Sequence, residues 1–345
     1  MTDSTPPQPQ PASTSAPHES LPIQPDVETS ISTILSQNRR SATTFTVSKH
    51  SKEAAKNWDK FYKNHQDKFF KDRHWTSREF GSQIAGSSSP AAGESNAGNG
   101  VKPKATNAED DREEETKMIS EDLGGNTGES VLLEVGCGVG NMLYPLVEAK
   151  EGLKVHCCDF SARAVDMVRS HPLYDPSRVN AFVFDLTSPP NTPSLSSHLT
   201  TPPYDSWPNI TTISLIFVLS AIPPHLHASV LTSLANLLPN GGHILFRDYA
   251  YGDLSQVRYH TKKDAAWAEP SLLTDDPQHN WYRRGDNTFN YFFKQEQLEK
   301  LASQVGLQGQ VETLRRTAVN RKSEVNMQRR FVQAKWYVPP KTSSS

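Results

Sequence analysis

Three alternating glycines follow an apolar, acid-bearing stretch near the middle of the chain. The stretch VLLEV contains Glu134, and the glycines are Gly136, Gly138 and Gly140. Glycines allow a tight turn and let the backbone approach a ligand where a side chain would collide. A second acid, Asp159, ends the next apolar stretch, where it would accept hydrogen bonds from ribose hydroxyl groups. Strand, glycine loop, helix, strand and acid together predict half of a doubly wound nucleotide-binding site.

The spacing of the glycines favours one cofactor. The dinucleotide fingerprint is G-x-G-x-x-G, whereas this loop reads G-x-G-x-G with an acid just before it. That pattern is typical of methyltransferases that use S-adenosylmethionine (SAM). We therefore expect Gly136 and Gly138 to contact SAM, and a dinucleotide or a glycine turn without a ligand is the alternative.

Two later strand ends also carry residues that could do chemistry. In an open α/β sheet, ligands bind beyond the carboxyl ends of the strands. One expected strand ends at Asp185 and Leu186, which would meet the adenine group. Another ends in the sequence FRDY, at Arg247, Asp248 and Tyr249. We expect Asp248 to face the methyl acceptor, Tyr249 to stack on it, and Arg247 to bind a phosphate or orient Asp248. The alternative is a buried ion pair with a packing tyrosine.

An aromatic and basic segment, NWDKFYKNHQDKFFKDRHW, lies about 60 residues before the glycine loop. Trp58 and Tyr62 share one face at helical spacing. An amphipathic helix that docks on a core would have the same pattern. However, aromatic rings stack on bases and guanidinium groups bind phosphate, so this segment is also suited to close over a cofactor and bind nucleic acid through Arg73 and His74.

The carboxyl-terminal part of the chain is locally basic. WYRRGD, which includes Arg284, resembles a lid over the substrate. Beyond it, residues 315–335 of the expected hairpin carry seven arginines and lysines against a single acid, Glu324, and an imbalance of this kind favours phosphate binding. The residues we expect to contact nucleic acid there are Arg321, Lys322, Arg329 and Arg330.

Alternating strands and helices position these groups. Apolar runs predict strands at 131–135, 154–158, 179–184, 210–222 and 243–249, with a final antiparallel pair at 309–318 and 328–338. Helices are expected after Gly140, from Ser161, after Pro224 and over 294–305. This order predicts the α/β, doubly wound, seven-stranded Rossmann-like fold of class I SAM-dependent methyltransferases.

Composition sets the domain boundaries and excludes several classes of protein. We expect a disordered tail at 1–45, the aromatic and basic segment at 46–80, a low-complexity insert at 81–128 and the catalytic domain at 129–340, with the lid insert at 251–288. The net charge of −2 gives no overall attraction to nucleic acid, and the three cysteines match neither a disulfide framework nor a metal site. No 18-residue apolar run and no signal peptide are present, so we expect a cytoplasmic protein without a membrane span.

Taken together, the motifs resemble the fungal and animal tRNA N3-methylcytidine methyltransferases. The pieces that carry the resemblance are the aromatic segment, LLEVGCGVGN, CDFS, FDLT, LIFVLSAI, LFRDY, WYRRGD and VNRKSEVNMQRRFVQAKW. They cover about 49–80 and 131–340. The sequence departs from the family after REF, where low-complexity sequence follows, and at 260–280, where the insert is long.

The resemblance implies a function and a set of contacts. The family methylates N3 of the cytidine at the 5′ start of the anticodon loop, position 32, in a subset of serine, threonine and arginine tRNAs. The resemblance also implies which residues contact the two substrates. Those expected to contact SAM are Trp58, Tyr62, Gly136, Asp159, Asp185, Leu186 and Ile216, and those expected at an everted base are Asp248 and Tyr249. A recruiting partner such as seryl-tRNA synthetase is left open. The alternatives are a SAM methyltransferase for a small molecule or protein side chain, and a non-catalytic RNA-binding adaptor.

Overall fold

The computed structural model describes residues 25–37, 41–66, 72–85, 130–189, 193–261, 280–320 and 325–341. Its centre is a seven-stranded sheet in the order β3-β2-β1-β4-β5-β9-β8. The first five of these strands are parallel, and β9 and β8 are antiparallel to their neighbours. The strands are β1 Ser130–Val135, β2 Leu153–Asp159, β3 Val179–Val183, β4 Thr212–Ile216, β5 Gly242–Tyr249, β8 Val311–Asn320 and β9 Val325–Val338. The predicted doubly wound methyltransferase sheet is therefore confirmed.

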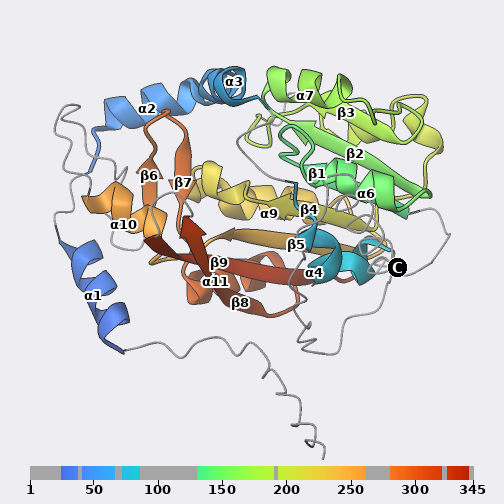
Figure 1. The fold of residues 1–345 in the computed structure, drawn as a ribbon. Helices are drawn as coiled ribbons and strands as arrows, with labels where there is room; N and C mark the ends of the chain where they lie inside the picture. The colour runs from blue at the N-terminus through green and yellow to red at the C-terminus, as the bar shows by residue number, and fades with distance from the viewer. Residues whose placement is uncertain are drawn as a thin grey trace, which may run out of the picture.

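Helices cover both faces of this sheet (Figure 1). The α-helices are α1 Pro25–Ser36, α2 Thr44–Lys52, α3 Ala54–His65, α4 Trp75–Ile84, α6 Leu143–Ala149, α7 Ala162–Arg169, α8 Leu195–Leu199, α9 His227–Ala235, α10 Leu254–Thr261 and α11 Gln295–Val305. Short 3₁₀ turns are η1 Tyr204–Ser206, η2 Leu219–Ala221 and η3 Pro224–Leu226. A separate two-stranded sheet pairs β6 Trp281–Arg283 with β7 Phe289–Tyr291.

The core has two layers because strand side chains alternate between the faces of the sheet. Leu133 and Val135 of β1 belong to the cluster that also contains the buried residues of α9 and α11. Leu132 points the other way, into the cluster formed with α4, α6 and α7. All six residues of β1 are buried, as expected for a central parallel strand.

β4 is shorter than its apolar sequence predicts. The strand ends at Ile216 and not near position 222, and the chain then turns through η2. Phe217, the next residue, has φ 59°, which lies outside the strand region. Because β4 ends at Ile216, Phe217 and the η2 turn lie at the carboxyl edge of the sheet, where a ligand is expected.

The N-terminal helices differ from the expected disordered tail. Pro25–Ser36 is a helix, so the prediction of disorder across 1–45 is wrong for this part. Leu35 is 1 % exposed, and α1 packs on α10. The reason is tertiary: the helix gains its stability by docking on the methyltransferase domain. Most of the expected insert at 81–128 lies outside the described residues, although α4 continues through Ile84.

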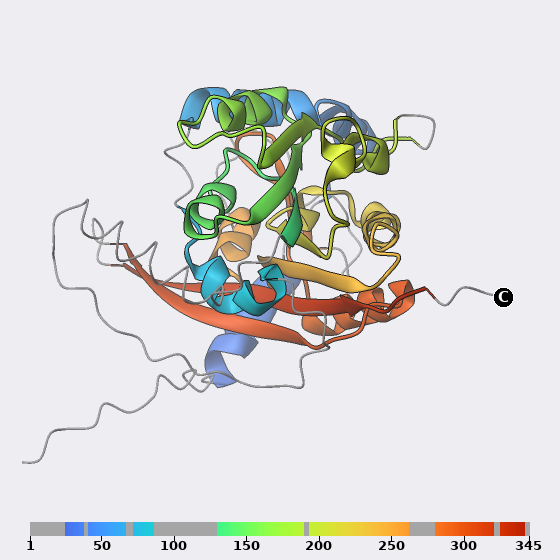
Figure 2. The same ribbon diagram turned by 90° about the vertical axis from the view of Figure 1, so that its right-hand side faces the viewer.

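α2 and α3 run along one end of the domain, from the β6–β7 hairpin to α7 (Figure 1). α3 contacts α7 directly, and α4 lies against the face of the β8–β9 part of the sheet in the turned view (Figure 2). Segments before the glycine loop in sequence thus lie over it in space. Within the described ranges, no helix is long and apolar enough to cross a bilayer.

Candidate active site

The glycine turn after β1 has the backbone conformation that its sequence predicts. Gly136 and Gly138 have φ 65° and 57°, a region that L residues rarely adopt. A Cβ on Gly136 would lie 2.4 Å from a methyl group of Val218, and one on Gly138 would lie 3.0 Å from the Tyr62 hydroxyl. The turn therefore requires glycine for its dihedral angles and for space.

The aromatic face of α3 covers this turn. Tyr62 is 5 % exposed, and the ring centroid of Trp58 lies 5.8 Å from that of Tyr62. Both side chains line a pocket between α3, the glycine turn and the carboxyl ends of β4 and β5. The residues that line it are Trp58, Tyr62, Arg73, Gly136, Cys137, Gly138, Asn141, Phe217, Ser220, Ala221, Tyr249, Arg284, Phe289 and Asn290. Tyr62 and Gly136, which are 74 residues apart in sequence, thus belong to one site, as expected for a lid over a cofactor.

Asp159 lies directly beneath the glycine turn. One carboxylate oxygen accepts a hydrogen bond from the Gly138 N–H at 3.0 Å, and the other accepts from the Ser161 N–H at 2.9 Å. Burial raises the pKa of Asp159 to about 6, although these N–H groups act in the opposite direction. Asp159 thus fixes the turn, and a carboxylate oxygen has a second lone pair for a ligand hydroxyl.

Arg73 lines the pocket, and the buried carboxyl group of Glu134, which is not among the lining residues, interacts electrostatically with it. Glu134 is 3 % exposed, and burial raises its pKa to about 8. Its Oε2 has no hydrogen-bond partner among the described residues. Burial lowers the pKa of Arg73, while Glu134, Tyr249, Tyr62 and Asp248 favour its charged form. Arg73 was expected to contact nucleic acid, but it lines the pocket, and its main-chain N–H donates to the Asn141 carbonyl beside the glycine turn at 2.7 Å.

Asp248 and Tyr249 lie at the end of β5, as predicted. Asp248 is fully buried and accepts hydrogen bonds from the N–H groups of Ser220 and Tyr249, both at 2.9 Å. Burial raises the pKa of Asp248 to about 7. The Tyr249 ring lines the pocket and packs on Phe217 at 5.0 Å between centroids. The carboxylate therefore lies just behind the pocket wall, held by two of the residues that form it, Ser220 and Tyr249.

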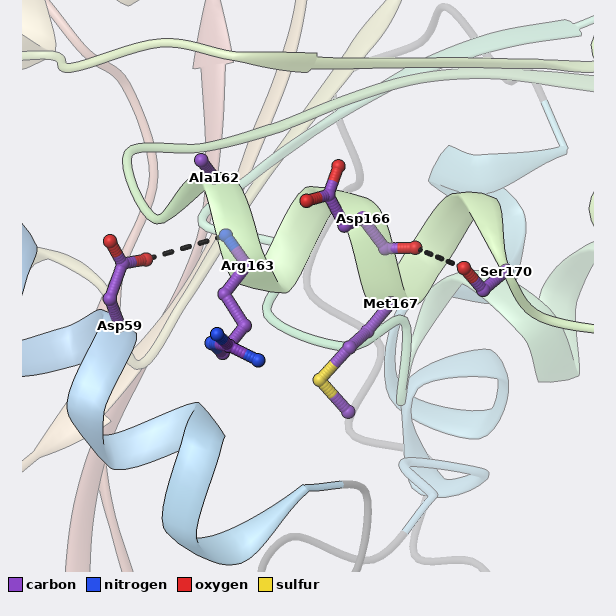
Figure 3. A pocket seen from close by; sticks show the side chains of 6 residues that line it. All are labelled: Asp59, Ala162, Arg163, Asp166, Met167 and Ser170. Atoms are coloured by element: carbon purple, nitrogen blue, oxygen red, sulfur yellow. Dashed lines mark hydrogen bonds between the residues drawn. The ribbon is translucent and has the colours of Figure 1, made fainter.

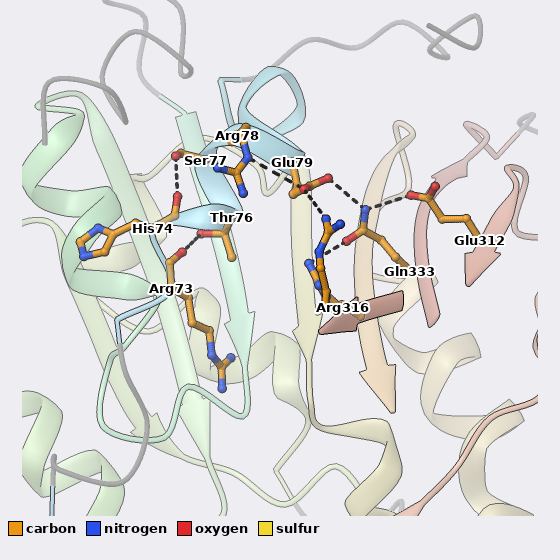
Figure 4. A network of polar contacts seen from close by, with 10 residues as sticks. Arg73, His74, Thr76, Ser77, Arg78, Glu79, Glu312, Arg316 and Gln333 are labelled. Atoms are coloured by element: carbon orange, nitrogen blue, oxygen red, sulfur yellow. Dashed lines mark hydrogen bonds and ion pairs between the residues drawn. The ribbon is translucent and has the colours of Figure 1, made fainter. Parts of the chain in front are cut away.

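Arg247 does not reach this pocket. Its guanidinium lies 4.0 Å from the ring centroid of Trp75, and its Nη1 donates to Gln333 at 3.3 Å. Adjacent residues of a strand point to opposite faces, so Arg247 and Asp248 diverge. Figure 4 shows Gln333 within the polar network that joins Glu79 of α4 to Glu312 of β8. The expectation that Arg247 binds a phosphate or orients Asp248 is corrected: its contacts are with α4 and β9.

Three of the residues expected to contact SAM, two of them at the adenine, are not among the residues that line the pocket. Asp185 accepts from the Thr187 N–H at 2.8 Å and from the Thr187 hydroxyl at 2.7 Å, so it shapes its own turn. Leu186 packs partly against the larger core cluster. Ile216 is buried, and its carbonyl accepts from Arg73 at 3.2 Å. Their roles toward SAM stay predictions.

The residues expected to contact nucleic acid divide into three groups. Arg284 lines the pocket, and His74 is half-buried at the start of α4. Arg329 donates to Asp253 at 2.9 Å. Arg330 is 4 % exposed and donates to Glu28 of α1 at 2.9 Å, so the prediction that it faces a ligand is wrong. Arg321 and Lys322 lie outside the described residues.

Phe217 and Asn290 are among the pocket residues that the sequence analysis did not single out. Phe217 is a non-glycine residue with positive φ, and such strain at a strand end often marks a functional site. Asn290, on β7, reaches the pocket from a strand that belongs to the separate hairpin. Their positions depend on tertiary packing, which residue type alone does not predict.

The side chains at this site fit SAM. Its ribose hydroxyls require acceptors, its ammonium and sulfonium groups favour nearby anions, and its carboxylate favours a guanidinium. Asp159 and Glu134 supply carboxylates, and the Glu134 Oε2 is a buried acceptor still available. Arg73 and Arg284 supply guanidinium groups at the pocket wall. No cluster of metal-ligating side chains occurs within the described segments.

Known proteins resemble the chain over most of its length. The profile of a methyltransferase domain matches residues 107–311. The chain is 35 % identical to the tRNA N(3)-methylcytidine methyltransferase trm141 of Schizosaccharomyces pombe, over 85 % of this chain and 95 % of that protein. It is 37 % identical to the tRNA N(3)-cytidine methyltransferase METTL2 of Xenopus tropicalis, over 85 % and 80 % of the two chains. For METTL6 of Rattus norvegicus the identity is 36 %, over 89 % and 87 %.

Solved structures of SAM-dependent methyltransferases are also similar. One from Anabaena variabilis superposes with a TM-score of 0.42 at 11 % identity, over 60 % of this chain and 76 % of that one. The sequence relatives are much nearer in sequence and match 85 % or more of the chain. With its sheet order, its glycine turn and this degree of identity, the chain belongs to the family of SAM-dependent tRNA N(3)-cytidine methyltransferases.

Proposed function

We propose that this protein transfers a methyl group from SAM to N3 of a cytidine in tRNA. The observation that carries the proposal is the position of Trp58 and Tyr62 against the glycine turn, because it joins the aromatic segment to the cofactor site. The relatives named above catalyse this reaction by name. A SAM methyltransferase for a small molecule or a protein side chain would give the basic C-terminal hairpin no role, and it predicts no salt-sensitive binding of tRNA.

The chemistry requires little proton transfer. N3 of cytosine has an in-plane lone pair, so its attack on the sulfonium methyl needs no general base. The product base is cationic, and catalysis therefore depends on orientation and on a negative charge nearby. N3 is concealed in a paired or stacked base, so the base must be everted into the pocket.

Asp248 and Tyr249 are suited to receive the everted base. Each Asp248 oxygen already accepts one main-chain N–H, and a carboxylate has about four acceptor positions. We propose that Asp248 accepts a hydrogen bond from the exocyclic amine of cytosine and stabilises the developing cation, while Tyr249 stacks on the ring. Gly136, Gly138 and Asp159 would hold SAM beneath Trp58 and Tyr62. Asp185 and Leu186 would lie toward the adenine, and Ile216 would also contact SAM.

The finer identity of the substrate follows from the family resemblance. We propose position 32 of the anticodon loop in tRNAs of the serine, threonine or arginine type as the target, with Arg73 and Arg284 beside the entering nucleotide. The hairpin residues Arg329, Arg321 and Lys322 are proposed to contact the anticodon stem. The three cysteines are buried free thiols, which supports a reducing, cytoplasmic setting.

The test is incubation of the protein with tritiated SAM and total tRNA, followed by nucleoside mass spectrometry. Label should appear in tRNA as N3-methylcytidine, with and without added seryl-tRNA synthetase as two arms of the experiment. Gly138→Ala should lose most of the label, because the new Cβ would meet Tyr62 at a φ that alanine disfavours. Label in another nucleoside, or tRNA binding without transfer, would contradict the proposal.

A further inference from the structure

α3 meets α7 through one carboxylate. Asp59 Oδ1 accepts a hydrogen bond from the Ser161 hydroxyl at 2.5 Å and another from the Arg163 N–H at 3.3 Å. Figure 3 shows Asp59 projecting from α3 toward the first turn of α7. The first N–H groups of a helix have no partner within the helix, and a carboxylate there is also favoured by the helix dipole. Asp59 therefore acts as a capping group that is supplied by a different helix.

The Asp59 contact continues without a break to the glycine turn. Ser161 is the N-cap residue of α7, and its hydroxyl oxygen accepts from the Ala164 N–H at 3.2 Å. The Ser161 N–H donates to Asp159, and Asp159 accepts from Gly138. One series of hydrogen bonds thus joins a surface helix to the turn that would hold the cofactor.

The apolar contact between α3 and the domain is small. Phe61, Tyr62, Val139 and Ala164 are its buried members, with Trp58 and Met167 packed partly against them. Tyr62 touches the glycine turn one helical turn after Asp59, so the helix is fixed at two points on the same side. A helix with such a small apolar contact depends strongly on each polar attachment.

We propose that Asp59 is a positioning residue that latches α3 closed over SAM through Ser161. The latch governs cofactor affinity and release and leaves the methyl-transfer step itself unchanged. It requires SAM as the methyl donor and is independent of which nucleic acid is methylated. Its failure is therefore distinguishable from failure of the proposed tRNA reaction.

The test is calorimetric titration of SAM into Asp59→Ala, with hydrogen exchange of residues 54–65 in the cofactor-free protein. Removing a hydrogen-bond acceptor of this kind should weaken SAM binding about tenfold, or about 1.4 kcal/mol. Exchange of the α3 amide hydrogens should be faster, and kcat at saturating SAM should stay within about twofold. Asp59→Asn keeps an acceptor oxygen at the same position and should restore most of the affinity.

Asp166→Ala is the matched control. Asp166 lines the same open groove between α3 and α7, but its carboxylate points away from α3 in Figure 3. The control removes the same charge and should leave SAM affinity and exchange unchanged. In a double-mutant cycle, the losses of SAM affinity in Asp59→Ala and Ser161→Ala should be non-additive, because each change breaks the same hydrogen bond. Normal SAM affinity in Asp59→Ala, or a fall in kcat with affinity unchanged, would overturn the latch.

Discussion

Asp248 is the most specific candidate for a catalytic group at the scale of a single residue. The neutral amide of Asp248→Asn keeps one acceptor oxygen but places an NH₂ group toward a main-chain N–H of Ser220 or Tyr249. It also removes the charge proposed to stabilise the cationic base. We expect turnover to fall by more than about tenfold, which corresponds to about 1.4 kcal/mol of transition-state stabilisation.

Single-turnover kinetics and SAM titration check this prediction together. The dissociation constant for SAM should change little, because the wall residues at the glycine turn are untouched. A thermal melt establishes that the variant is folded. Turnover near that of the native protein would remove Asp248 from the reaction.

Two buried acids on the cofactor side make SAM binding dependent on pH. Burial raises the pKa of Asp159 to about 6 and that of Glu134 to about 8. SAM carries a net positive charge, and a nearby cation favours ionised carboxylates. Binding should therefore release protons at neutral pH, and SAM affinity should rise between about pH 6 and pH 8, where these acids ionise in the free protein.

Calorimetry at pH 7 in two buffers with different ionisation enthalpies measures the released protons. The same acids have opposite consequences for the stability of the SAM-free protein. Because their folded pKa values lie above the unfolded value of about 4, the folded state binds more protons, and its stability declines as pH rises through the folded values. Identical heats in both buffers would show that SAM does not meet these carboxylates.

α1 illustrates how a single acidic residue can attach a helix to the rest of the molecule. Glu28 of α1 lies 2.8 Å from the Arg330 guanidinium and 3.8 Å from that of Arg315. The Glu28 side chain is 37 % exposed, whereas that of Arg330 is 5 % exposed. Glu28→Ala leaves a buried guanidinium without this partner. The exposure of Glu28 reduces the effect, so we expect a loss of about 1–2 kcal/mol in the free energy of unfolding.

Urea denaturation measures this loss. Glu151→Ala is the control, because it removes an equal charge from an exposed turn before β2. Hydrogen exchange in α1 should also be faster in Glu28→Ala and unchanged in the control. Equal stability of the two variants would mean that apolar packing around Leu35, and not the ion pair, attaches the helix.

The elements that sequence predicts best are those with a local cause. A continuous apolar run gives β1, the alternating glycines give the turn, and Ser161 caps α7 as expected. α1 was missed because its composition is that of a disordered tail and its order comes from docking. Arg330 was misplaced because an abundance of basic residues says nothing about which of them an acid from another helix will bury.

The active site shows the same division. Gly138, Asp159 and Tyr249 follow from strand ends, where topology decides position. Arg247 is only two residues before Tyr249, yet it lies under α4, because distance from the strand end matters as much as the motif. Arg73 moved from the expected tRNA surface to the pocket, since the loop before α4 bonds to Asn141 beside the glycine turn.

At the scale of the whole molecule, α3 contacts both the cofactor site and the β6–β7 hairpin on the substrate side. At the cofactor side, Tyr62 touches Gly138. At the other side, the Asn57 side chain donates to the Asn287 carbonyl at 3.3 Å, in the turn that joins β6 to β7. Arg284, in the same turn, lies 6.0 Å from the centre of the Phe61 ring. Closure of α3 over SAM should therefore also order the β6–β7 hairpin, whose Arg284 is proposed to lie beside the entering nucleotide.

This arrangement predicts that cofactor and tRNA bind cooperatively. S-adenosylhomocysteine, which occupies the cofactor site without reacting, should tighten tRNA binding by about 5- to 10-fold, and tRNA should tighten cofactor binding by the same factor. Asn57→Ala removes the bond to the hairpin and should reduce this factor toward one, while SAM affinity without tRNA changes little. Lys56→Ala, an exposed neighbour on α3, should keep the factor even where its tRNA affinity falls. Because linkage is reciprocal, both titrations must give one coupling factor. If S-adenosylhomocysteine leaves the tRNA affinity of the native protein unchanged, α3 covers the cofactor but does not couple cofactor binding to tRNA binding.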